Sequence, residues 1–204
     1  MNLRLLRFAR NDRGYGTCRM KDNGITLIEL IVVISVVGIL AVALGFEFQG
    51  WMGGYRSENQ MKEMYVDLMN ARTRALQRNR MHFVSLTATS YVVREDINPW
   101  PDGDGLLNAS DNVRPAGYTD PIPCLQKNLN PSYPLTWSDV ADVRIDFSKK
   151  GLSNDVKTIC INSTIETDYN CILISVSRIN LGKLTTKIPA PYGGTCDSAN
   201  CIAR

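Results

Sequence analysis

Residues 25–46 read ITLIELIVVISVVGILAVALGF, and Glu29 is the one ionisable residue among them. As an α-helix this stretch would be about 33 Å long, which is enough to cross the hydrocarbon core of a bilayer. The apolar residues of the chain, 44% of 204, are concentrated here. The stretch therefore predicts a membrane-spanning helix near the N-terminus.

The residues that precede this stretch are mainly basic. Six Lys and Arg side chains stand against two Asp side chains, and positive charge beside a membrane-spanning helix favours the cytoplasmic side. We therefore expect a single-pass protein whose N-terminal end stays in the cytoplasm and whose remaining chain is exported. The charged residues are Arg4, Arg7, Arg10, Asp12, Arg13, Arg19, Lys21 and Asp22.

An ordinary secretory signal peptide is the alternative for this region. Its cleavage site would be the small-residue sequence Ala41-Val42-Ala43. The apolar core of a signal peptide is usually about 7 to 15 residues long, however, and residues 25–46 exceed that length. A carboxylate at Glu29, near the start of the apolar run, is also unusual for a signal peptide.

A polar leader that ends in glycine comes directly before the apolar stretch, in the sequence Lys21-Asp22-Asn23-Gly24-Ile25-Thr26-Leu27-Ile28-Glu29-Leu30. This junction resembles the leader junction of type IV prepilins and type II secretion pseudopilins. The resemblance implies that a prepilin peptidase cleaves after Gly24 and methylates the new amine of Ile25, where the family usually has Phe. A start at Met20 would leave a leader of five residues.

Glu29 lies four residues after Ile25, one helical turn or about 6 Å away, so the two share a face of the helix. An ionised side chain inside the bilayer costs about 2.5 to 3.5 kcal/mol, which indicates a functional partner. The resemblance implies that Glu29 neutralises the N-terminal amine of a neighbouring subunit during filament assembly. The alternative is a glutamate at a helix end without such a partner.

We expect residues 47–80 to form a soft segment, in which the helix is locally weakened, followed by an amphipathic helix. Glycines at positions 45, 50, 53 and 54 weaken a helix by about 1 kcal/mol each, so the helix either loosens there or ends at Gly53-Gly54. Apolar side chains then recur with helical spacing, which predicts a helix that covers a sheet. They are Met61, Met64, Tyr65, Leu68, Ala71, Ala75 and Leu76.

Residues 81–204 predict an exported β-rich domain. Alternating or apolar runs at 82–86, 91–94, 143–147, 158–162 and 172–177 are typical of antiparallel strands. Seven of the nine prolines fall within 96–134, which we expect to be a long irregular loop. The fold class is thus α+β, a long N-terminal helix packed on an antiparallel sheet, as in pilins.

The order of the elements from 80 to 190 looks like that of the minor pilin and pseudopilin H branch of the superfamily. That branch has a strand ending in Phe before a nearby Gly, here Phe147 and Gly151, and a later strand ending in Gly-Arg. In this chain Ser177 occupies the glycine position before Arg178.

Five cysteines follow the leader, since Cys18 would be removed with it, and disulfides persist in an exported domain. Cys196 and Cys201 bracket a short loop, and Cys160 and Cys171 end the facing strands of a hairpin. We therefore predict the bonds Cys196–Cys201 and Cys160–Cys171. Cys124 would then be free or paired with another chain.

Metal and cofactor chemistry has little support in the sequence. His82 is the single histidine and no Cys-x-x-Cys pair exists, which excludes a multi-histidine centre and makes zinc improbable on composition. His82 lies at a helix-to-strand junction, where a packing role is far commoner than a catalytic one. Asp102 and Asp104 could bind Ca²⁺, but no glutamate closes a twelve-residue loop, so a plain turn is favoured and no cofactor is expected.

Three functions are compatible with these features. We favour a structural, non-enzymatic minor pilin or pseudopilin that helps to initiate or cap a filament, with prepilin peptidase, other pilins and the inner-membrane assembly machinery as partners. A filament-borne DNA receptor is the second, because Arg178, Lys183 and Lys187 follow Cys171, but a dispersed basic cluster makes DNA an unlikely partner. A single-pass anchored protein of another function is the third. The sequence leaves open whether the filament is a pilus or a secretion pseudopilus.

Overall fold

The computed structural model describes residues 25–100, 102–112, 125–189 and 191–204, and within these ranges the side chains of residues 44–50, 110 and 112 are not described. The predictions for Gly24, Cys18, Met20 and Cys124 lie outside the described residues. The chain divides into two units, residues 1–44 and residues 45–204.

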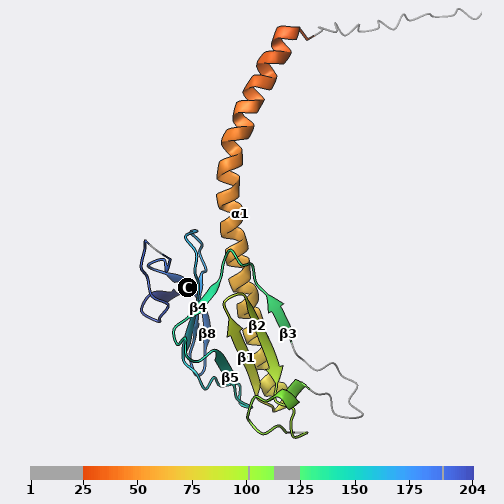
Figure 1. Cartoon of the computed structure of the whole chain (residues 1–204), viewed down its shortest axis with the longest axis vertical. Helices are drawn as coiled ribbons and strands as arrows, with labels where there is room; N and C mark the ends of the chain where they lie inside the picture. The colour runs from red at the N-terminus through yellow and green to blue at the C-terminus, as the bar shows by residue number, and fades with distance from the viewer. Residues whose placement is uncertain (1–24, 101, 113–124, 190) are drawn as a thin grey trace, which may run out of the picture. The chain divides into compact units, whose positions relative to one another are not determined.

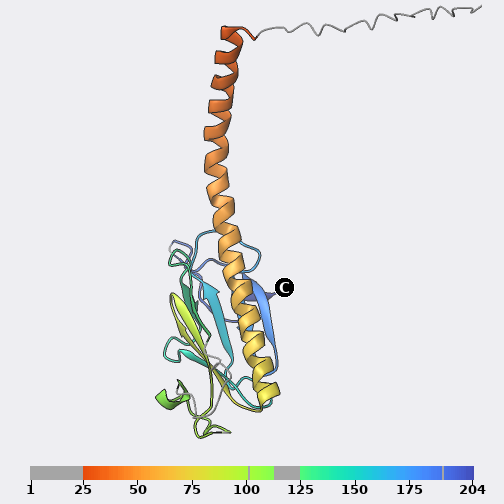
Figure 2. The same cartoon turned by 90° about the vertical axis from the view of Figure 1, so that its right-hand side faces the viewer.

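Helix α1 runs from Leu27 to Arg78 without interruption. The predicted stripe is confirmed in its second half, where Met61, Met64, Leu68, Ala71 and Ala75 are all at most 2% exposed. Within residues 45–204 this part of α1 lies along the strands (Figures 1 and 2). Leu76, also predicted for the stripe, is 51% exposed instead.

The C-terminus of α1 is set by a local hydrogen-bonding motif. Asn79 follows the last helical residue with φ of 53°, in the left-handed region that asparagine tolerates better than most residues. The amide of Arg80 then donates to the carbonyl of Ala75 at 3.3 Å, which is the six-to-one bond of a Schellman motif. This bond satisfies a carbonyl that the end of the helix would otherwise leave free.

Gly53 and Gly54 do not end the helix, so termination, one of the two alternatives for this segment, is wrong. Instead they let a loop approach closely. A Cβ at Gly53 would lie 2.7 Å from Cδ1 of Ile165, and one at Gly54 would lie 3.1 Å from the carbonyl oxygen of Glu166. The glycines are therefore packing positions in this structure.

Sheet A has four antiparallel strands in the order β3-β2-β1-β5. The predicted loop 96–134 is wrong in part, because residues 125–128 pair with β2 as an edge strand and residues 109–112 form a short 3-10 helix, η1. Only alternate side chains of this strand are partly covered, so its apolar pattern is weak. The strands are β1 (His82–Thr87), β2 (Ser90–Glu95), β3 (Leu125–Asn128) and β5 (Arg144–Phe147).

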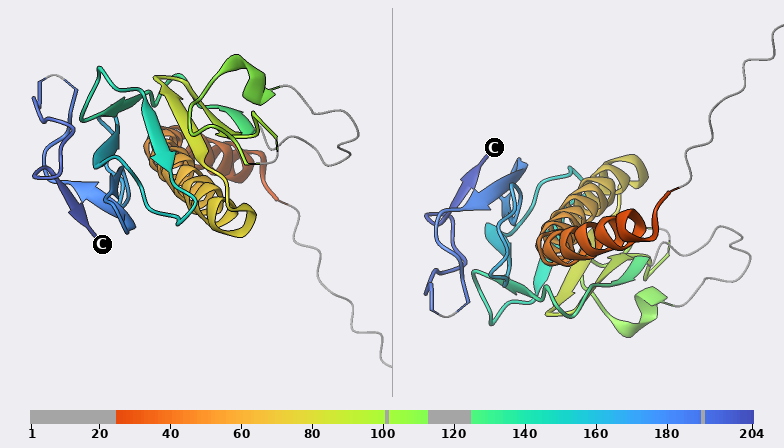
Figure 3. Two further views of the ribbon diagram at one scale, coloured as in Figure 1. Left: turned by 90° about the horizontal axis from the view of Figure 1, so that it is seen from below. Right: turned by 90° about the horizontal axis from the view of Figure 1, so that it is seen from above.

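Sheet B has five antiparallel strands in the order β4-β6-β7-β8-β9. Both sheets contribute to one core with the stripe of α1, and Figure 3 shows this part of α1 between strands of the two sheets. The predicted α+β class is confirmed. The strands are β4 (Leu135–Trp137), β6 (Lys157–Ile161), β7 (Cys171–Ile174), β8 (Ile179–Leu184) and β9 (Cys201–Ala203).

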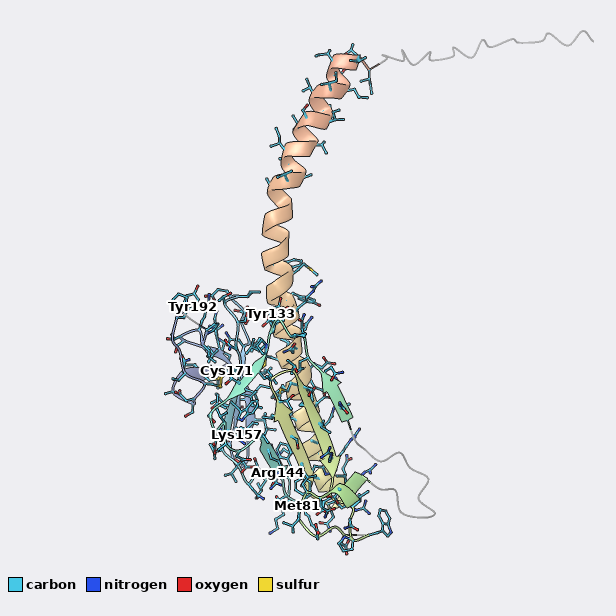
Figure 4. All side chains as sticks on the ribbon, viewed as in Figure 1. Met81, Tyr133, Arg144, Lys157, Cys171 and Tyr192 are labelled. Carbon is cyan, nitrogen blue, oxygen red and sulfur yellow. A yellow bond between two sulfur atoms is a disulfide. The ribbon has the colours of Figure 1, made fainter. Side chains whose placement is uncertain are left out.

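A buried lysine links the two sheets. Lys157, the first residue of β6, is 2% exposed, and its ammonium donates to the carbonyl oxygens of Asp142 at 2.7 Å and Arg144 at 2.5 Å. It also donates to the carboxylate of Asp142 at 3.0 Å. Because a buried ammonium is costly without partners, these contacts fix β6 of sheet B beside β5 of sheet A (Figure 4).

The predicted disulfide pairing is wrong. The bonds are Cys160–Cys196 and Cys171–Cys201. Each joins a strand of sheet B to the C-terminal segment, the part of the chain that follows β8. Cys160 and Cys171 are indeed opposite each other on β6 and β7, as predicted. Both side chains, however, lie in a small apolar cluster with Leu184 and Cys201 on which the C-terminal segment packs. Position in the sequence therefore predicted correctly that Cys160 and Cys171 face each other, but it did not predict which cysteines are bonded.

The loop between Cys196 and Cys201 is a tight turn held by Asp197. The carboxylate of Asp197 accepts hydrogen bonds from the amides of Ala199 and Asn200, at 2.9 and 2.8 Å, and the amide of Cys201 donates to the carbonyl of Asp197. This tight turn belongs to a segment that returns across sheet B. Cys196 reaches β6, and Cys201 begins β9 and reaches β7 across β8.

Gly182 on β8 provides the space for the second disulfide. A Cβ there would lie 2.6 Å from the carbonyl oxygen of Ile202 on β9, 2.8 Å from Sγ of Cys201 and 3.1 Å from Sγ of Cys171. We expect Gly182→Ala to destabilise the domain by about 1 to 3 kcal/mol, the usual cost of overpacking. Thermal unfolding of the oxidised protein measures this, with Asn180→Ala, an exposed position on the same strand, as the control. Equal melting temperatures for the two variants would contradict the packing role.

Candidate assembly site

The start of α1 is fixed by Thr26. The amide of Glu29 donates to the Thr26 hydroxyl at 3.3 Å, and the amide of Leu30 donates to the Thr26 carbonyl at 3.2 Å. Thr26 is thus the N-cap, and Glu29 stands in the first turn, where the helix dipole favours a negative charge. Thr26 was not singled out from the sequence, although Thr-x-x-Glu is the signature of a capping box.

The apolar segment that follows is exposed on every side. Each large apolar side chain from Ile25 to Val42 is between 45% and 77% exposed, and the side chains point outward all round the helix (Figure 4). The hydroxyl of Ser35 is satisfied within the helix by the carbonyl of Ile31, at 2.8 Å. A helix that is apolar all round is normally buried by other helices or by lipid. Moving one of these side chains fully out of water into such a cover is worth roughly 1.5 to 3 kcal/mol.

The predicted membrane span, residues 25–46, is not confirmed. Side chains of α1 are described for residues 27–43 and 51–78, and no helix among the described residues combines the length and the hydropathy needed to cross a membrane.

The residues of the predicted processing and assembly site are only partly placed. Gly24 lies outside the described residues. Ile25 is 73% exposed just before the N-cap, and Glu29 is exposed one turn further on. The amine that cleavage after Gly24 would create therefore belongs to an accessible residue, at the same end of the helix as the exposed side chain of Glu29.

Comparison with protein families gives a match at this position. Residues 19–45 match the family described as the prokaryotic N-terminal methylation motif. The chain carries the N-terminal methylation motif of type IV prepilins. The predicted resemblance at the leader junction is confirmed, and the motif covers both Gly24 and Glu29.

Among solved structures, the chain is similar to the type IV minor pilin FimU of Pseudomonas aeruginosa strain PAO1 in two crystal forms. In one, the identity is 15% over 61% of this chain and 87% of that chain; in the other, it is 16% over 61% and 91%. The TM-score is 0.41 in both cases. A comparison with curated proteins gave no match.

Two of the three basic side chains considered for DNA, Lys183 and Lys187, are held in ion pairs. Lys187 lies 3.2 Å from Glu166, and Lys183 lies 3.6 Å from Glu166 and 3.8 Å from Asp168. The hydrogen bond from Lys187 and the charges of both lysines hold the pKa of Glu166 below its usual value. Arg178 precedes β8, whereas Lys183 lies near its other end, so the structure does not gather the three cations on one patch.

The two aspartates considered for Ca²⁺ lie in a loop ordered by its own backbone. Asp104 accepts a hydrogen bond from the amide of Leu106 at 2.8 Å, and the neighbouring Asp96 accepts from the amides of Asp104 and Gly105. The carbonyl of Asp102 accepts from Lys149 at 3.1 Å. Within the described ranges there is no group of three or more His, Cys, Asp or Glu side chains able to hold a metal ion.

One exposed aromatic pair was not singled out from the sequence. Trp51 and Tyr55 stack on α1 with ring centroids 6.4 Å apart and are 67% and 58% exposed. They line a hollow of about 510 Å³ with Gly54 and Ile165. Their spacing of four residues, about one helical turn, was the available signal.

His82 is a packing residue, as predicted. It is fully buried at the start of β1, opposite Glu95, which is itself buried and paired with Arg78 at 2.8 Å and Arg80 at 3.0 Å. Burial lowers the pKa of His82 below its usual value of 6.5, more than the Glu95 charge raises it. The imidazole is therefore neutral in the folded protein at neutral pH.

This burial makes stability depend on pH. Because the folded pKa is depressed, the unfolded state takes up the proton first, and stability falls as the pH drops below about 6.5. The slope is at most about 1.4 kcal/mol per pH unit. We expect His82→Gln to flatten the fall in thermal stability between pH 7 and pH 5. Parallel curves for the wild type and the variant would show that another group titrates there.

Proposed function

We propose that this protein is a structural, non-enzymatic pilin-like subunit, a minor pilin or pseudopilin, that assembles into a type IV filament through its N-terminal helix. One observation carries the proposal: directly after a methylation-motif junction, the chain presents a helix whose apolar side chains are exposed on every side. Such a surface needs neighbours, and similar helices of other subunits are the partners that the motif supports.

The two halves of α1 differ in which of their side chains are buried, which supports different roles for them. From Met61 to Ala75 the helix buries one stripe against its own two sheets. From Ile25 to Val42 it buries nothing within the described chain, so this part is available for contacts between subunits. The exported domain would then be carried on the outside of the filament.

The processing steps follow from the motif. A prepilin peptidase would cleave after Gly24 and methylate the amine of Ile25, while the chain is anchored at the inner membrane with its domain in the periplasm. A role in initiating or capping the filament is part of the proposal. Reception of DNA is not favoured, because Lys183 and Lys187 already have carboxylate partners.

The first consequence is a defined N-terminus. We expect the mature chain to begin with N-methylated Ile25, because the motif places the cut after Gly24. Mass mapping of the N-terminal peptide from the membrane fraction measures this, with a Gly24→Asp variant as the unprocessed control. A mature chain that starts at Leu44 would point to signal peptidase and would exclude a pilin-like subunit.

The second consequence concerns the charge of Glu29. In the proposed filament its carboxylate neutralises the Ile25 amine of a neighbour, because a buried ion without a partner is strongly unfavourable. We expect Glu29→Leu and Glu29→Gln to be cleaved normally and to be at least tenfold depleted in sheared filaments. The measurement is an immunoblot of the sheared and membrane fractions.

A matched variant separates the charge from the helix cap. Thr26→Ala removes the hydrogen bond to the Glu29 amide, which costs about 1 kcal/mol of helix stability, and leaves the carboxylate in place. We expect this variant to enter filaments. If Glu29→Gln, which retains capping ability, assembled like the wild type, the carboxylate would not be the docking group.

A further inference from the structure

The two disulfides of the exported domain cross each other in sequence order. The four cysteines follow one another as Cys160, Cys171, Cys196 and Cys201, and the bonds join the first to the third and the second to the fourth. Oxidation of the nearest neighbours along the chain would join the first to the second and the third to the fourth. Native and nearest-neighbour pairing therefore share no bond.

The nearest-neighbour bond between Cys160 and Cys171 is sterically accessible. These residues face each other on β6 and β7. The amide of Ile161 donates to the carbonyl of Asn170, the next facing pair, so Cys160 and Cys171 form a non-hydrogen-bonded pair. Cα atoms in such a pair lie about 4.5 Å apart, within the range that a disulfide spans.

Chain statistics favour the wrong bonds before the domain is complete. Cys160 and Cys171 are 11 residues apart, whereas the native bond of Cys160 spans 36 residues. Loop closure that scales as the three-halves power of length favours the shorter loop about sixfold. Cys196 and Cys201 are only five residues apart, against 30 for the native bond of Cys201. Each cysteine therefore meets a wrong partner first.

Tertiary packing reverses this preference. The native sulfurs share one apolar cluster with Leu173, Leu184 and Ile188, and this cluster is complete only when the C-terminal segment lies on sheet B. Gly182 leaves room for the Cys171–Cys201 bond above β8. The folded domain thus stabilises a pairing that the unfolded chain rarely samples, and bonds formed early must be exchanged.

We propose that the chain is a substrate of a thiol–disulfide isomerase, a dithiol catalyst that converts the local pairs Cys160–Cys171 and Cys196–Cys201 into the native ones. The proposal rests on the proposed function only in requiring export to an oxidising compartment. It does not require assembly into a filament.

The exchange is balanced without an external oxidant. A catalyst thiolate attacks Sγ of Cys171, forms a mixed disulfide and releases the Cys160 thiolate. Cys160 attacks Sγ of Cys196, forms the first native bond and releases the Cys201 thiolate. Cys201 then attacks Sγ of Cys171 in the mixed disulfide, forms the second native bond and regenerates the catalyst thiolate.

The test follows the pairing in the purified full chain. The detergent-solubilised protein carries Cys18→Ser and Cys124→Ser, so that only the four cysteines of the native pairs remain. It is reduced, unfolded and reoxidised in glutathione buffer with or without a purified CxxC disulfide isomerase. Samples are alkylated and digested with trypsin and a protease that cleaves at Asp. Cleavage at Asp168 separates Cys160 from Cys171, and cleavage at Asp197 separates Cys196 from Cys201. Tryptic cleavage at Arg178, Lys183 and Lys187 separates Cys171 from Cys196, so every pairing gives a distinct disulfide-linked peptide.

We expect the two local bonds to dominate early samples and the isomerase to speed their conversion at least tenfold. A Cys160→Ala/Cys196→Ala variant in the same background has one possible bond, so its oxidation should not depend on the isomerase. Native pairing of the four-cysteine chain at the same rate without catalyst would overturn the proposal. A second result would also overturn it: native pairing without catalyst in the chain that retains Cys124, together with its absence in the Cys124→Ser variant. The chain would then catalyse its own exchange through Cys124.

The same comparison can be made in cells. In a strain that has its periplasmic oxidase but lacks its disulfide isomerase, the full chain should accumulate with peptides of the local pairs. Native pairing at wild-type levels there would contradict the proposal, whether or not filaments are present. Failure of filament assembly with native pairing intact would instead count against the proposed function alone.

Discussion

The contact that the folded unit of residues 45–204 depends on is the stripe of α1 formed by Met61, Met64, Leu68, Ala71 and Ala75. Both sheets pack against this stripe in one core. A sheet with one apolar face needs a second layer to cover it, and here one helix covers two sheets. Each of the five positions is nearly inaccessible to solvent, so a larger or polar side chain at any of them would disturb both sheets at once.

Polar side chains then fix how the two sheets meet around that helix. Lys157, the first residue of β6, donates hydrogen bonds to the segment that enters β5. Glu95, at the end of β2, receives Arg78 from the last turn of α1 and Arg80 just after it. These buried charges are compensated by direct partners, and they specify geometry that apolar packing alone would leave loose.

The first part of α1 has the opposite relation to its surroundings. Its apolar side chains are exposed and have no covering layer in the described chain, whereas the methylation motif marks its start. One continuous helix thus combines a stripe used for folding with an all-round apolar surface. Such a surface is stabilised only when lipid or neighbouring helices cover it.

Features that depend on local periodicity and short motifs were predictable from the amino-acid sequence. The apolar run, the leader junction and the helical stripe after Gly54 are patterns within one or a few turns, and Thr26 was equally visible as a capping residue. The tertiary structure alone decided which cysteines pair, that residues 125–128 form an edge strand, and that the basic side chains near β8 already have carboxylate partners. Each of these depends on segments distant in sequence: Asn128 meets Ser90, Cys160 meets Cys196, and Lys187 meets Glu166. Local spacing contains no information on such encounters, because the folded core, and not the length of chain between two residues, brings them together.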